Sequence, residues 1–171
     1  NLEQFDLRIN KKKIVIFKQT LFYYKFNLCL PHVSWFGSKA CKLKDLKNID
    51  LLRAIKNKKY PFYRVDTLFS DTKYQSVNVV SNGGWHFSNL KSVEELERKF
   101  LNDENHSEYE LQGHNIDRIR ENIKNRSIDY NHNAKKDSSD RFSPTKLQFT
   151  DIDILPSYLK INLDKYKEWI D

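Results

Sequence analysis

The sequence of 171 residues has no methionine, only two cysteines, and only four glycines and four prolines. Cys29 and Cys41 lack the CxxC spacing of a metal site or redox pair and are too few for a disulfide framework, so we expect both to be reduced and packed. No apolar run approaches the ~18 residues of a membrane span, and the opening NLEQFDLRINKKK is unlike a signal peptide. Because the chain does not begin with methionine, we expect a fragment or a processed product.

Hydrophobic residues make up 39% of the chain and aromatic residues 13%, which excludes a disordered protein. The length suits one domain, so residues 1–171 are predicted to form a single, incomplete domain. Its 30 Lys and Arg against 23 Asp and Glu leave a net charge of +7, which indicates an anionic partner such as nucleic acid, an anionic membrane or a nucleotide-sugar diphosphate. A lysine-rich surface that only keeps the protein in solution explains the charge equally well.

Three stretches near the start are rich in β-forming residues: KIVIF at 13–17, LFYYKFNLCL at 21–30 and VSWF at 33–36. We expect three strands, separated by Lys18–Thr20 and by Pro31-His32. In the second stretch the alternation predicts one buried face and one face in water. The buried face would carry Phe22, Tyr24, Phe26, Leu28 and Leu30, and the wet face Tyr23, Lys25 and Asn27.

Helical spacing recurs further along the chain. Asp45 is predicted to cap a helix that lies on the sheet and ends before Pro61, with Leu46, Ile49, Leu52 and Ile55 on one side. Ser76–Val80 should be a strand, and Ser92 with Glu95 forms a capping box for a helix reaching Leu101. A helix carrying Ile116, Ile119 and Ile123, and a terminal helix after Pro156 with Leu163, Tyr166 and Ile170 inward, complete an α/β fold with a mixed sheet flanked by helices.

The segment 131–146, NHNAKKDSSDRFSPTK, contains little apolar content apart from Phe142. Polar segments of this length between structured elements are typical of flexible loops, and such loops often cover active sites. We therefore predict a flexible loop at 131–146.

Half of the glycines stand together in SNGGWHFSNL at 81–90. Gly83 and Gly84 permit a sharp turn or the close approach of a ligand, and they follow a predicted strand and precede a predicted helix. Exposed backbone amides at such a junction are a common ligand site of open α/β sheets. A tight turn whose two aromatic residues fill the core is the alternative.

Several side chains are candidates for chemistry. Trp35 and Trp85 each lie beside glycine after a strand, where an indole ring can stack on a sugar, or can simply pack in the core. His106 and Glu108 in NHSEYE would share a face in an extended segment, as a base and its partner or as two exposed polar residues. The five histidines show no HExxH motif and no zinc spacing.

The string GGWHFSNL, followed by ERKF and then by H-x-E-Y, resembles the glycosyltransferase family of the β-1,4-mannosyl-glycoprotein 4-β-N-acetylglucosaminyltransferases. FKQTLFYYKFNL, WFGSK, LLRAIK and the closing LPSYLKINLDKYKEW agree with that family in the same order, so the resemblance covers nearly the whole chain. It implies the C-terminal part of an A-type nucleotide-sugar glycosyltransferase fold. It also implies an inverting transfer of N-acetylglucosamine or a related sugar from a nucleotide-diphosphate donor, such as UDP-GlcNAc for the former, to a glycan hydroxyl.

The resemblance assigns expected roles to particular residues. Glu108 would be the catalytic base with His106 beside it, and His86 would contact the donor phosphates or the metal ion. The substrate-binding candidates are Trp35, Lys39, Gly83, Gly84, Trp85, His86 and Ser88. A divalent metal ion, Mn²⁺ or Mg²⁺, is implied as cofactor, and no nucleic acid is expected as partner.

One family feature is missing. Family members carry upstream an acidic segment of the Asp-x-Asp-Glu kind, which holds the metal ion and the donor diphosphate, and this chain has none. We therefore expect these residues alone to be inactive. The expected location is the cytoplasm or, for a full-length eukaryotic enzyme, the Golgi lumen. The alternatives are a basic nucleic-acid-binding module or nuclease, which only composition supports, and a noncatalytic sugar-binding fragment.

Overall fold

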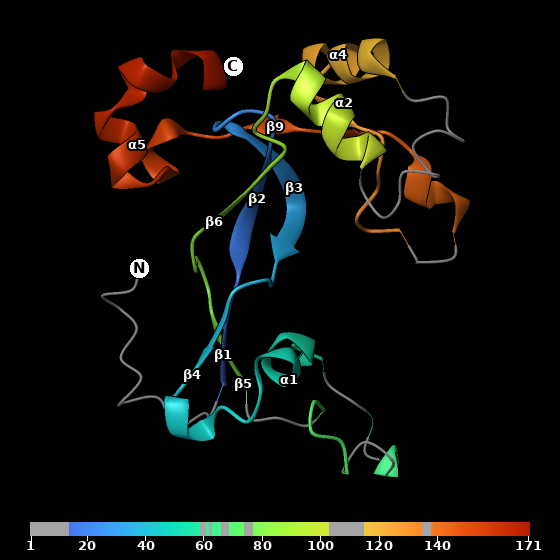
Figure 1. Cartoon of the computed structure of the whole chain (residues 1–171), viewed down its shortest axis with the longest axis vertical. Coiled ribbons are helices and arrows are strands. Elements are labelled where there is room, and N and C mark those ends of the chain that lie inside the picture. Colours follow the sequence, from blue (N-terminus) through green and yellow to red (C-terminus); the bar gives the residue numbers. More distant parts are fainter. Residues whose placement is uncertain are drawn as a thin grey trace. The chain divides into compact units, whose positions relative to one another are not determined.

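The computed structural model describes residues 14–58, 61, 63–65, 69–73, 77–102, 115–134 and 138–171 (Figure 1). The chain divides into two compact units. Unit 1 comprises Asn1–Thr20 and Ser34–Gly84, and unit 2 comprises Leu21–Val33 and Trp85–Asp171. Two compact units can belong to one domain or to two, so the expectation of a single domain stays a prediction.

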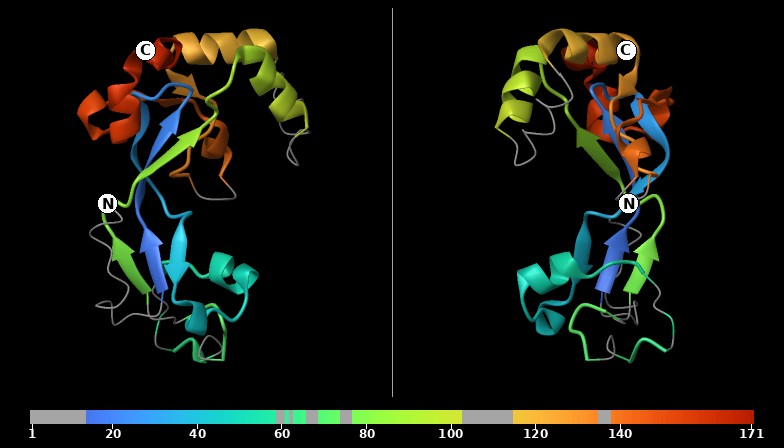
Figure 2. Two further views of the ribbon diagram at one scale, coloured as in Figure 1. Left: turned by 60° about the vertical axis from the view of Figure 1, so that its left-hand side comes forward. Right: turned by 90° about the vertical axis from the view of Figure 1, so that its right-hand side faces the viewer.

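Unit 1 is built on a three-stranded mixed sheet in the order β4-β1-β5. The central strand β1 (Ile14–Phe17) pairs parallel with β5 (Val77–Val80) and antiparallel with β4 (Lys39–Cys41), as Figure 2 shows. A central strand is buried on both faces, and the continuous apolar run IVIF suits this position because all four of its residues are buried. The predicted strands at KIVIF and SVNVV are therefore confirmed, apart from Lys13 and Ser76, which lie outside the described residues.

One helix, α1 (Ile49–Ala54), covers this sheet. Its Leu52 and the following Ile55 pack with Ile14 and Ile16, which confirms that the helix lies on the sheet. The predicted cap was wrong: the side chain of Asn48 accepts the N–H of Asp50 (2.7 Å), and Asp45 ends the preceding 3₁₀ turn η1 (Leu43–Asp45). A polar side chain immediately before the first helical residue takes the free N–H groups, and Asp45 is too far upstream to do so.

Unit 2 contains a four-stranded sheet in the order β6-β2-β3-β9. The stretch 21–30, predicted as one strand, instead forms a hairpin of β2 (Gln19–Tyr23) and β3 (Leu28–Trp35). Tyr24 turns the chain with a left-handed φ of 62°. Strand β3 then continues through Pro31-His32, which were predicted to interrupt it.

The hairpin turn also corrects the burial expected for Asn27. Its side chain is only 6% exposed, although the alternation placed it in water. The Asn27 amide donates to the backbone carbonyl of Asp171 (3.0 Å) and accepts the Asp171 N–H (2.9 Å). A buried amide is stable when its hydrogen bonds are satisfied, and two bonds to one backbone satisfy Asn27.

The Gly-Gly motif leads into a strand, β6 (Trp85–Ser88), and not directly into a helix. The N–H of Thr20 donates to the carbonyl of Gly84 (3.1 Å), and the N–H of Tyr24 donates to the carbonyl of Ser88 (3.2 Å). From the first bond to the second, the donor along β2 and the acceptor along β6 both move four residues towards the carboxyl end, so β6 runs parallel to β2. Helix α2 (Val93–Leu101) follows, with the predicted capping box of Ser92 and Glu95.

Helices α2 and α4 (Ile116–Lys124) pack side by side in unit 2. Their apolar residues join the hairpin in one core, which confirms the helix predicted from Ile116, Ile119 and Ile123. This core comprises Leu21, Tyr24, Leu28, Leu30, Leu96, Ile119, Ile128 and Leu147. The expected α/β class, with mixed sheets flanked by helices, is therefore confirmed.

The segment predicted as a loop, 131–146, contains short regular elements. These are the 3₁₀ helix η3 (Ser139–Phe142) and strand β8 (Thr145–Lys146), which pairs antiparallel with β7 (Ser127–Ile128). Residues 135–137 lie outside the described residues. The flexibility of the segment stays a prediction, but its ends are held by backbone pairing.

The last part of the chain forms three short elements after strand β9 (Gln148–Phe149), which pairs with β3. They are η4 (Ile152–Ile154), α5 (Ser157–Ile161) and η5 (Leu163–Trp169), where one terminal helix was predicted after Pro156. Tyr166 packs inward as expected, against a second core around Phe22, Leu155 and Leu159. Within the described ranges, no helix has the length and apolar character to cross a membrane.

The turn at Gly83 yields a first test. A Cβ atom at this position would lie 2.7 Å from Cβ and 2.9 Å from Cα of Phe17, so an added methyl group must displace backbone. We expect Gly83→Ala to lower the free energy of unfolding by about 1–3 kcal/mol in urea titrations. Ser81→Ala, at an exposed position of the same turn, is the control; equal stability of the two variants would contradict the close contact.

Candidate functional site

Strand β6 presents the side chains of the WHFS motif alternately to two faces. Trp85 and Phe87 pack into the core around Phe22, whose ring centroid lies 5.0 Å from that of Phe87. The Trp85 indole N–H donates to the backbone carbonyl of Ile154 (2.6 Å). This satisfied, half-buried indole favours the packing alternative for Trp85, while its role in sugar binding stays a prediction.

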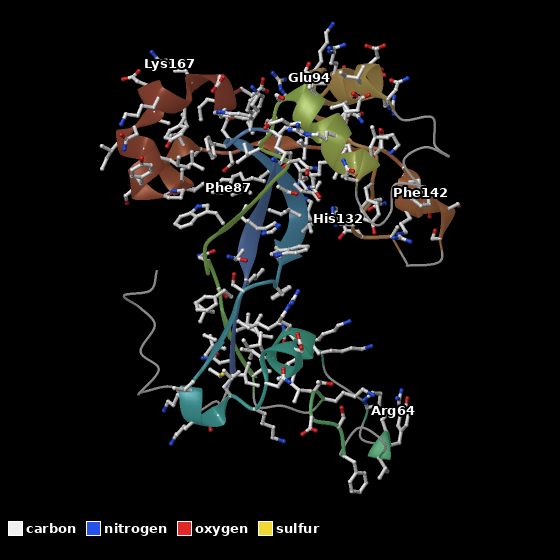
Figure 3. All side chains as sticks on the ribbon, in the orientation of Figure 1. Arg64, Phe87, Glu94, His132, Phe142 and Lys167 are labelled. Carbon is white, nitrogen blue, oxygen red and sulfur yellow. The ribbon has the colours of Figure 1, made fainter. Side chains whose placement is uncertain are left out.

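His86 and Ser88 point to the opposite face because successive side chains of a strand alternate. The Ser88 side chain is hydrogen-bonded to Tyr23 of the neighbouring strand. The Tyr23 hydroxyl in turn lies 2.9 Å from Nε2 of His132. Figure 3 labels Phe87 and His132, which lie on opposite sides of the sheet.

Two more residues lie against this chain of hydrogen bonds. The ring of Tyr130 meets that of His132 edge to face, with centroids 4.7 Å apart. Nε of Arg141 donates to the Tyr130 hydroxyl (3.0 Å), and the Arg141 guanidinium also lies 5.4 Å from the centroid of that ring. We call the five side chains, Tyr23, Ser88, Tyr130, His132 and Arg141, the polar cluster.

Helix α4 holds the segment that carries the polar cluster. Arg118 makes a two-pronged contact with the Asp129 carboxylate, at 3.0 Å from Nε and 2.7 Å from the terminal nitrogen, and this raises the pKa of Arg118. Asn122 donates to the same carboxylate at 2.5 Å. Because the Asp129 side chain is only 9% exposed, this arrangement fixes the backbone directly before Tyr130.

The ionisation states follow from burial. Burial raises the pKa of Tyr23, a hydrogen bond from Ser88 lowers it, and the nearby Tyr130 raises it; the phenol is therefore protonated near neutral pH. Burial lowers the pKa of His132, so its imidazole is neutral. For the Tyr23 hydroxyl to donate to Nε2 of His132, the imidazole proton must lie on Nδ1.

His86 lies near a cation of helix α2. Burial lowers the pKa of His86 first, and the charge of Lys99 lowers it further. The Lys99 ammonium donates to the Asn89 side chain (2.6 Å), which keeps the lysine close to the end of β6. A neutral imidazole beside an ammonium group suits an anionic oxygen or a metal ion.

The arrangement supplies groups for proton transfer. A neutral imidazole can accept a proton, a buried phenol can pass one on, and Arg141 can stabilise a nearby negative charge. His132 is hydrogen-bonded to Tyr23 of β2, and Tyr23 to Ser88 of β6, so this part of the site is held by regular elements. We therefore regard the polar cluster with His86 and Lys99 as the candidate functional site of unit 2.

The backbone groups of the Gly-Gly turn were predicted to be exposed to a ligand, but two of them are hydrogen-bonded within the protein. The N–H of Gly83 donates to the carbonyl of Lys18 (2.8 Å), and the carbonyl of Gly84 accepts from Thr20. Gly84 has a φ of 120°, which explains glycine there. The turn uses these two groups for strand pairing, so they are not available to a ligand.

Trp35 and Lys39 lie in unit 1. The Trp35 indole folds back over Gly37, where a Cβ atom would lie 2.1 Å from its Nε1, and 37% of the residue is exposed. The ammonium of Lys39 donates to the backbone carbonyl of Arg53. Binding roles for both residues stay predictions.

The predicted catalytic base, Glu108, and its partner His106 lie outside the described residues. Among the residues that the structure does describe, no group of three or more His, Cys, Asp or Glu side chains is placed to hold a metal ion. His86 as a metal ligand stays a prediction. Cys29 and Cys41 are free and half-buried, as expected.

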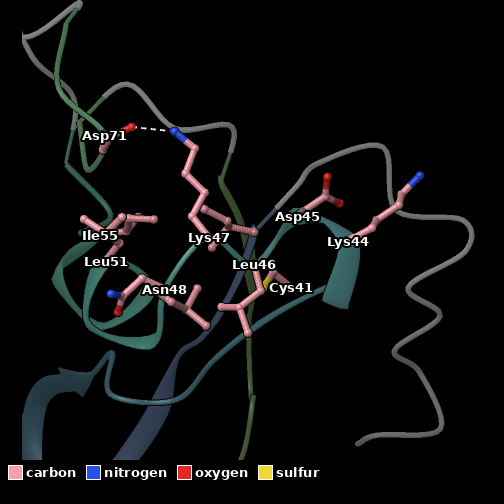
Figure 4. Close-up of a pocket in the computed structure, with 11 residues that line it drawn as sticks. Cys41, Lys44, Asp45, Leu46, Lys47, Asn48, Leu51, Ile55 and Asp71 are labelled. Atoms are coloured by element: carbon pink, nitrogen blue, oxygen red, sulfur yellow. Dashed lines mark hydrogen bonds and ion pairs between the residues drawn. The ribbon is translucent and has the colours of Figure 1, made fainter.

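Unit 1 contains a pocket of about 220 Å³ between η1 and α1 (Figure 4). Its floor is apolar, and Lys47 at its rim pairs with Asp71 (2.6 Å). The lining residues are Ile14, Cys41, Lys44, Asp45, Leu46, Lys47, Asn48, Leu51, Leu52, Ile55 and Asp71. None of the residues predicted to bind substrate lines this pocket.

Sequence reasoning missed four of the five members of the polar cluster. Tyr23 was assigned to a wet strand face, and Tyr130, His132 and Arg141 fell in or beside the predicted loop. The signal that could have found them is YNH at 130–132, two aromatic rings in an otherwise polar segment.

Comparison with protein-family models, with curated proteins and with solved structures finds no significant match. The function must therefore be argued from the sequence resemblance and from the chemistry of the site.

The Tyr23–His132 pair yields a second test. NMR titration should place the pKa of His132 below the ordinary value of about 6.5, and Tyr23→Phe should raise it because the phenol donates to the neutral form. With this pKa lowered, the unfolded state binds more protons than the folded state, so stability should fall as the pH drops below about 6.5. Tyr158→Phe, at an exposed position of α5, is the control; a His132 midpoint above the ordinary value would refute the assignment.

Proposed function

We propose that the protein is a nucleotide-sugar glycosyltransferase, which transfers N-acetylglucosamine from UDP-GlcNAc, or a related sugar from its own nucleotide-diphosphate donor, to a glycan hydroxyl with inversion. The observation that carries the proposal is the position of the GGWHFS motif. His86 and Ser88, whose motif resembles the family, lie on the face of β6 where Ser88 joins Tyr23 and His132 in one chain of hydrogen bonds. The motif therefore contributes directly to a group of proton-transferring side chains.

Inversion requires the acceptor hydroxyl to lose its proton as it attacks the anomeric carbon, while the diphosphate leaves on the opposite side. A well-placed base is worth about 10²–10⁴ in rate. Glu108 remains the proposed base, with His106 beside it. The polar cluster supports the same chemistry, because its neutral imidazole can accept a proton and its phenol can orient an acceptor hydroxyl.

The donor diphosphate needs positive charge or hydrogen-bond donors close to it. His86 with Lys99 on unit 2 supplies both kinds of group, and a divalent metal ion, Mn²⁺ or Mg²⁺, would neutralise the leaving diphosphate when bound. The proposed role of His86 is to contact the phosphates or this metal ion. Ser88, on the same face of β6 as His86, is the proposed contact of the sugar, whereas Trp85 packs on the opposite face.

The role of His86 can be tested by calorimetric titration of UDP-GlcNAc with Mn²⁺ into the chain joined to an upstream acidic segment of the family. We expect His86→Ala to weaken donor binding about ten- to a hundredfold and to lower turnover as well, because a hydrogen bond to a charged group typically contributes ~1.5–3 kcal/mol. His32→Ala, at an exposed position of β3, is the matched histidine control and should leave the affinity unchanged. Unchanged affinity together with unchanged turnover in His86→Ala would return GGWHFS to a turn with two core aromatic residues.

The role of Glu108 requires the chain joined to an upstream acidic segment of the family. In that protein, Glu108→Gln should lower turnover by ~10² or more while donor binding stays nearly intact, since a base acts in the transition state. Glu104→Gln is the matched acidic control. If Glu108→Gln leaves turnover unchanged, Glu108 is not the base. If the unmutated protein transfers no sugar to any of the glycan acceptors tested, the proposed function is wrong.

A further inference from the structure

The basic excess of the chain belongs to unit 1. Among the described residues, unit 1 carries ten Lys and Arg against three Asp, whereas unit 2 carries thirteen Lys and Arg against twelve Asp and Glu. The cations of unit 1 are Lys18, Lys39, Lys42, Lys44, Lys47, Arg53, Lys56, Lys58, Arg64 and Lys73. Unit 1 therefore offers a place for an anionic partner that is separate from His86 and Lys99 of unit 2.

Three of these cations meet at the carboxyl end of α1. Lys39 is the partner of Ile16 in the sheet register, and Ile16 packs against Ile55 just after α1. Lys39 therefore projects on the helix-covered face, where its ammonium donates to the carbonyl of Arg53. Its side chain is half-buried, while Arg53 and Lys56 are exposed around it.

The three cations have no acidic partner among the residues that the structure describes. Burial lowers the pKa of Lys39, and the positive charges of Lys56 and then Arg53 lower it further, so the three cations lie close enough to repel one another. Within the described part of unit 1, Asp71 pairs with Lys47, and no acidic side chain pairs with Lys39, Arg53 or Lys56.

The helix dipole does not supply the missing charge. The carboxyl end of a full-length helix carries roughly half a negative elementary charge, and α1 has only 6 residues. Three cations therefore face at most a fraction of one opposing charge. A bound anion would relieve this repulsion, which makes binding favourable beyond the direct contacts.

We propose that Lys39, Arg53 and Lys56 form a binding site for a compact oligophosphate, such as the diphosphate of a nucleotide. An arginine fork and two ammonium groups match the several anionic oxygens of adjacent phosphates. Lys39 bonds to the carbonyl of Arg53, and Lys56 follows three residues later in the chain, so the three cations lie close together. A compact group of cations favours a short oligophosphate over the extended backbone of a nucleic acid. The inference goes beyond the proposed function, because phosphate binding by unit 1 requires no sugar transfer.

The experiment is calorimetric titration of the chain with inorganic pyrophosphate at low salt. Lys56→Met should weaken binding on the order of tenfold, and so should Lys39→Met and Arg53→Met, since each removes one charge-assisted contact. Lys56 is exposed, so its variant keeps the test valid if loss of the Lys39 bond to Arg53 impairs folding. Added salt should weaken binding by the unmutated chain.

Lys44→Met is the matched control, because Lys44 is an exposed lysine of unit 1 outside this cluster. It should keep the unmutated affinity; an equal loss in Lys44→Met and Lys56→Met would show a diffuse charge effect and overturn the site. Titrations with UDP and with phosphatidylserine vesicles show whether the phosphate comes from a nucleotide or from a lipid. The ligand that binds more tightly is the source, and Lys56→Met should weaken its binding. Absence of pyrophosphate binding, or tighter binding of an oligonucleotide, would overturn the proposal, whatever the outcome of the transfer assays.

Discussion

The arrangement of the candidate site depends on the register of β6 against β2. The bond from the Tyr24 N–H to the Ser88 carbonyl fixes this register, and the alternation of WHFS then sends Trp85 and Phe87 into the core and His86 and Ser88 to the other face. A slip by one residue would exchange the two faces, and it would bury an imidazole while exposing two large aromatic rings. The Phe22–Phe87 contact opposes such a slip, so the apolar half of the motif positions the polar half.

Charge and proton-transfer groups are distributed unequally in the chain. Unit 1 carries an excess of cations over a small sheet, whereas unit 2, with nearly balanced charge, holds the neutral imidazoles of His86 and His132. Burial produces the neutral imidazoles, while Lys39, Arg53 and Lys56 lie together with no acidic partner among the described residues. The two proposals therefore rest on different physical causes, and each can fail without the other.

Elements with strong local signals could be predicted from the sequence. The IVIF strand, the capping box at Ser92 and the Ile116 helix each depend on neighbours within a few residues, and all three are present. The hairpin at 21–30 could not be predicted, because a tyrosine in the left-handed region at Tyr24 has no sequence signature and the period of two continues through it. The polar cluster combines Tyr23 with His132, which lie far apart in the sequence, so its membership depends on tertiary packing that no local pattern records.

The parallel pairing of β1 with β5 and of β2 with β6 also affects how the chain reaches its fold. Ile14 pairs with Val77, and Thr20 bonds to Gly84, so the intervening chain must be ordered or looped out before either pair can close. Contacts between such distant residues slow folding, whereas the β2–β3 hairpin can form early from neighbouring residues. During synthesis, the hairpin emerges well before β5 and β6, and its buried side chains, such as Phe22, stay exposed until the later strands arrive. Expression at lower temperature, or with a chaperone that covers exposed apolar surface, should therefore raise the soluble yield of the chain.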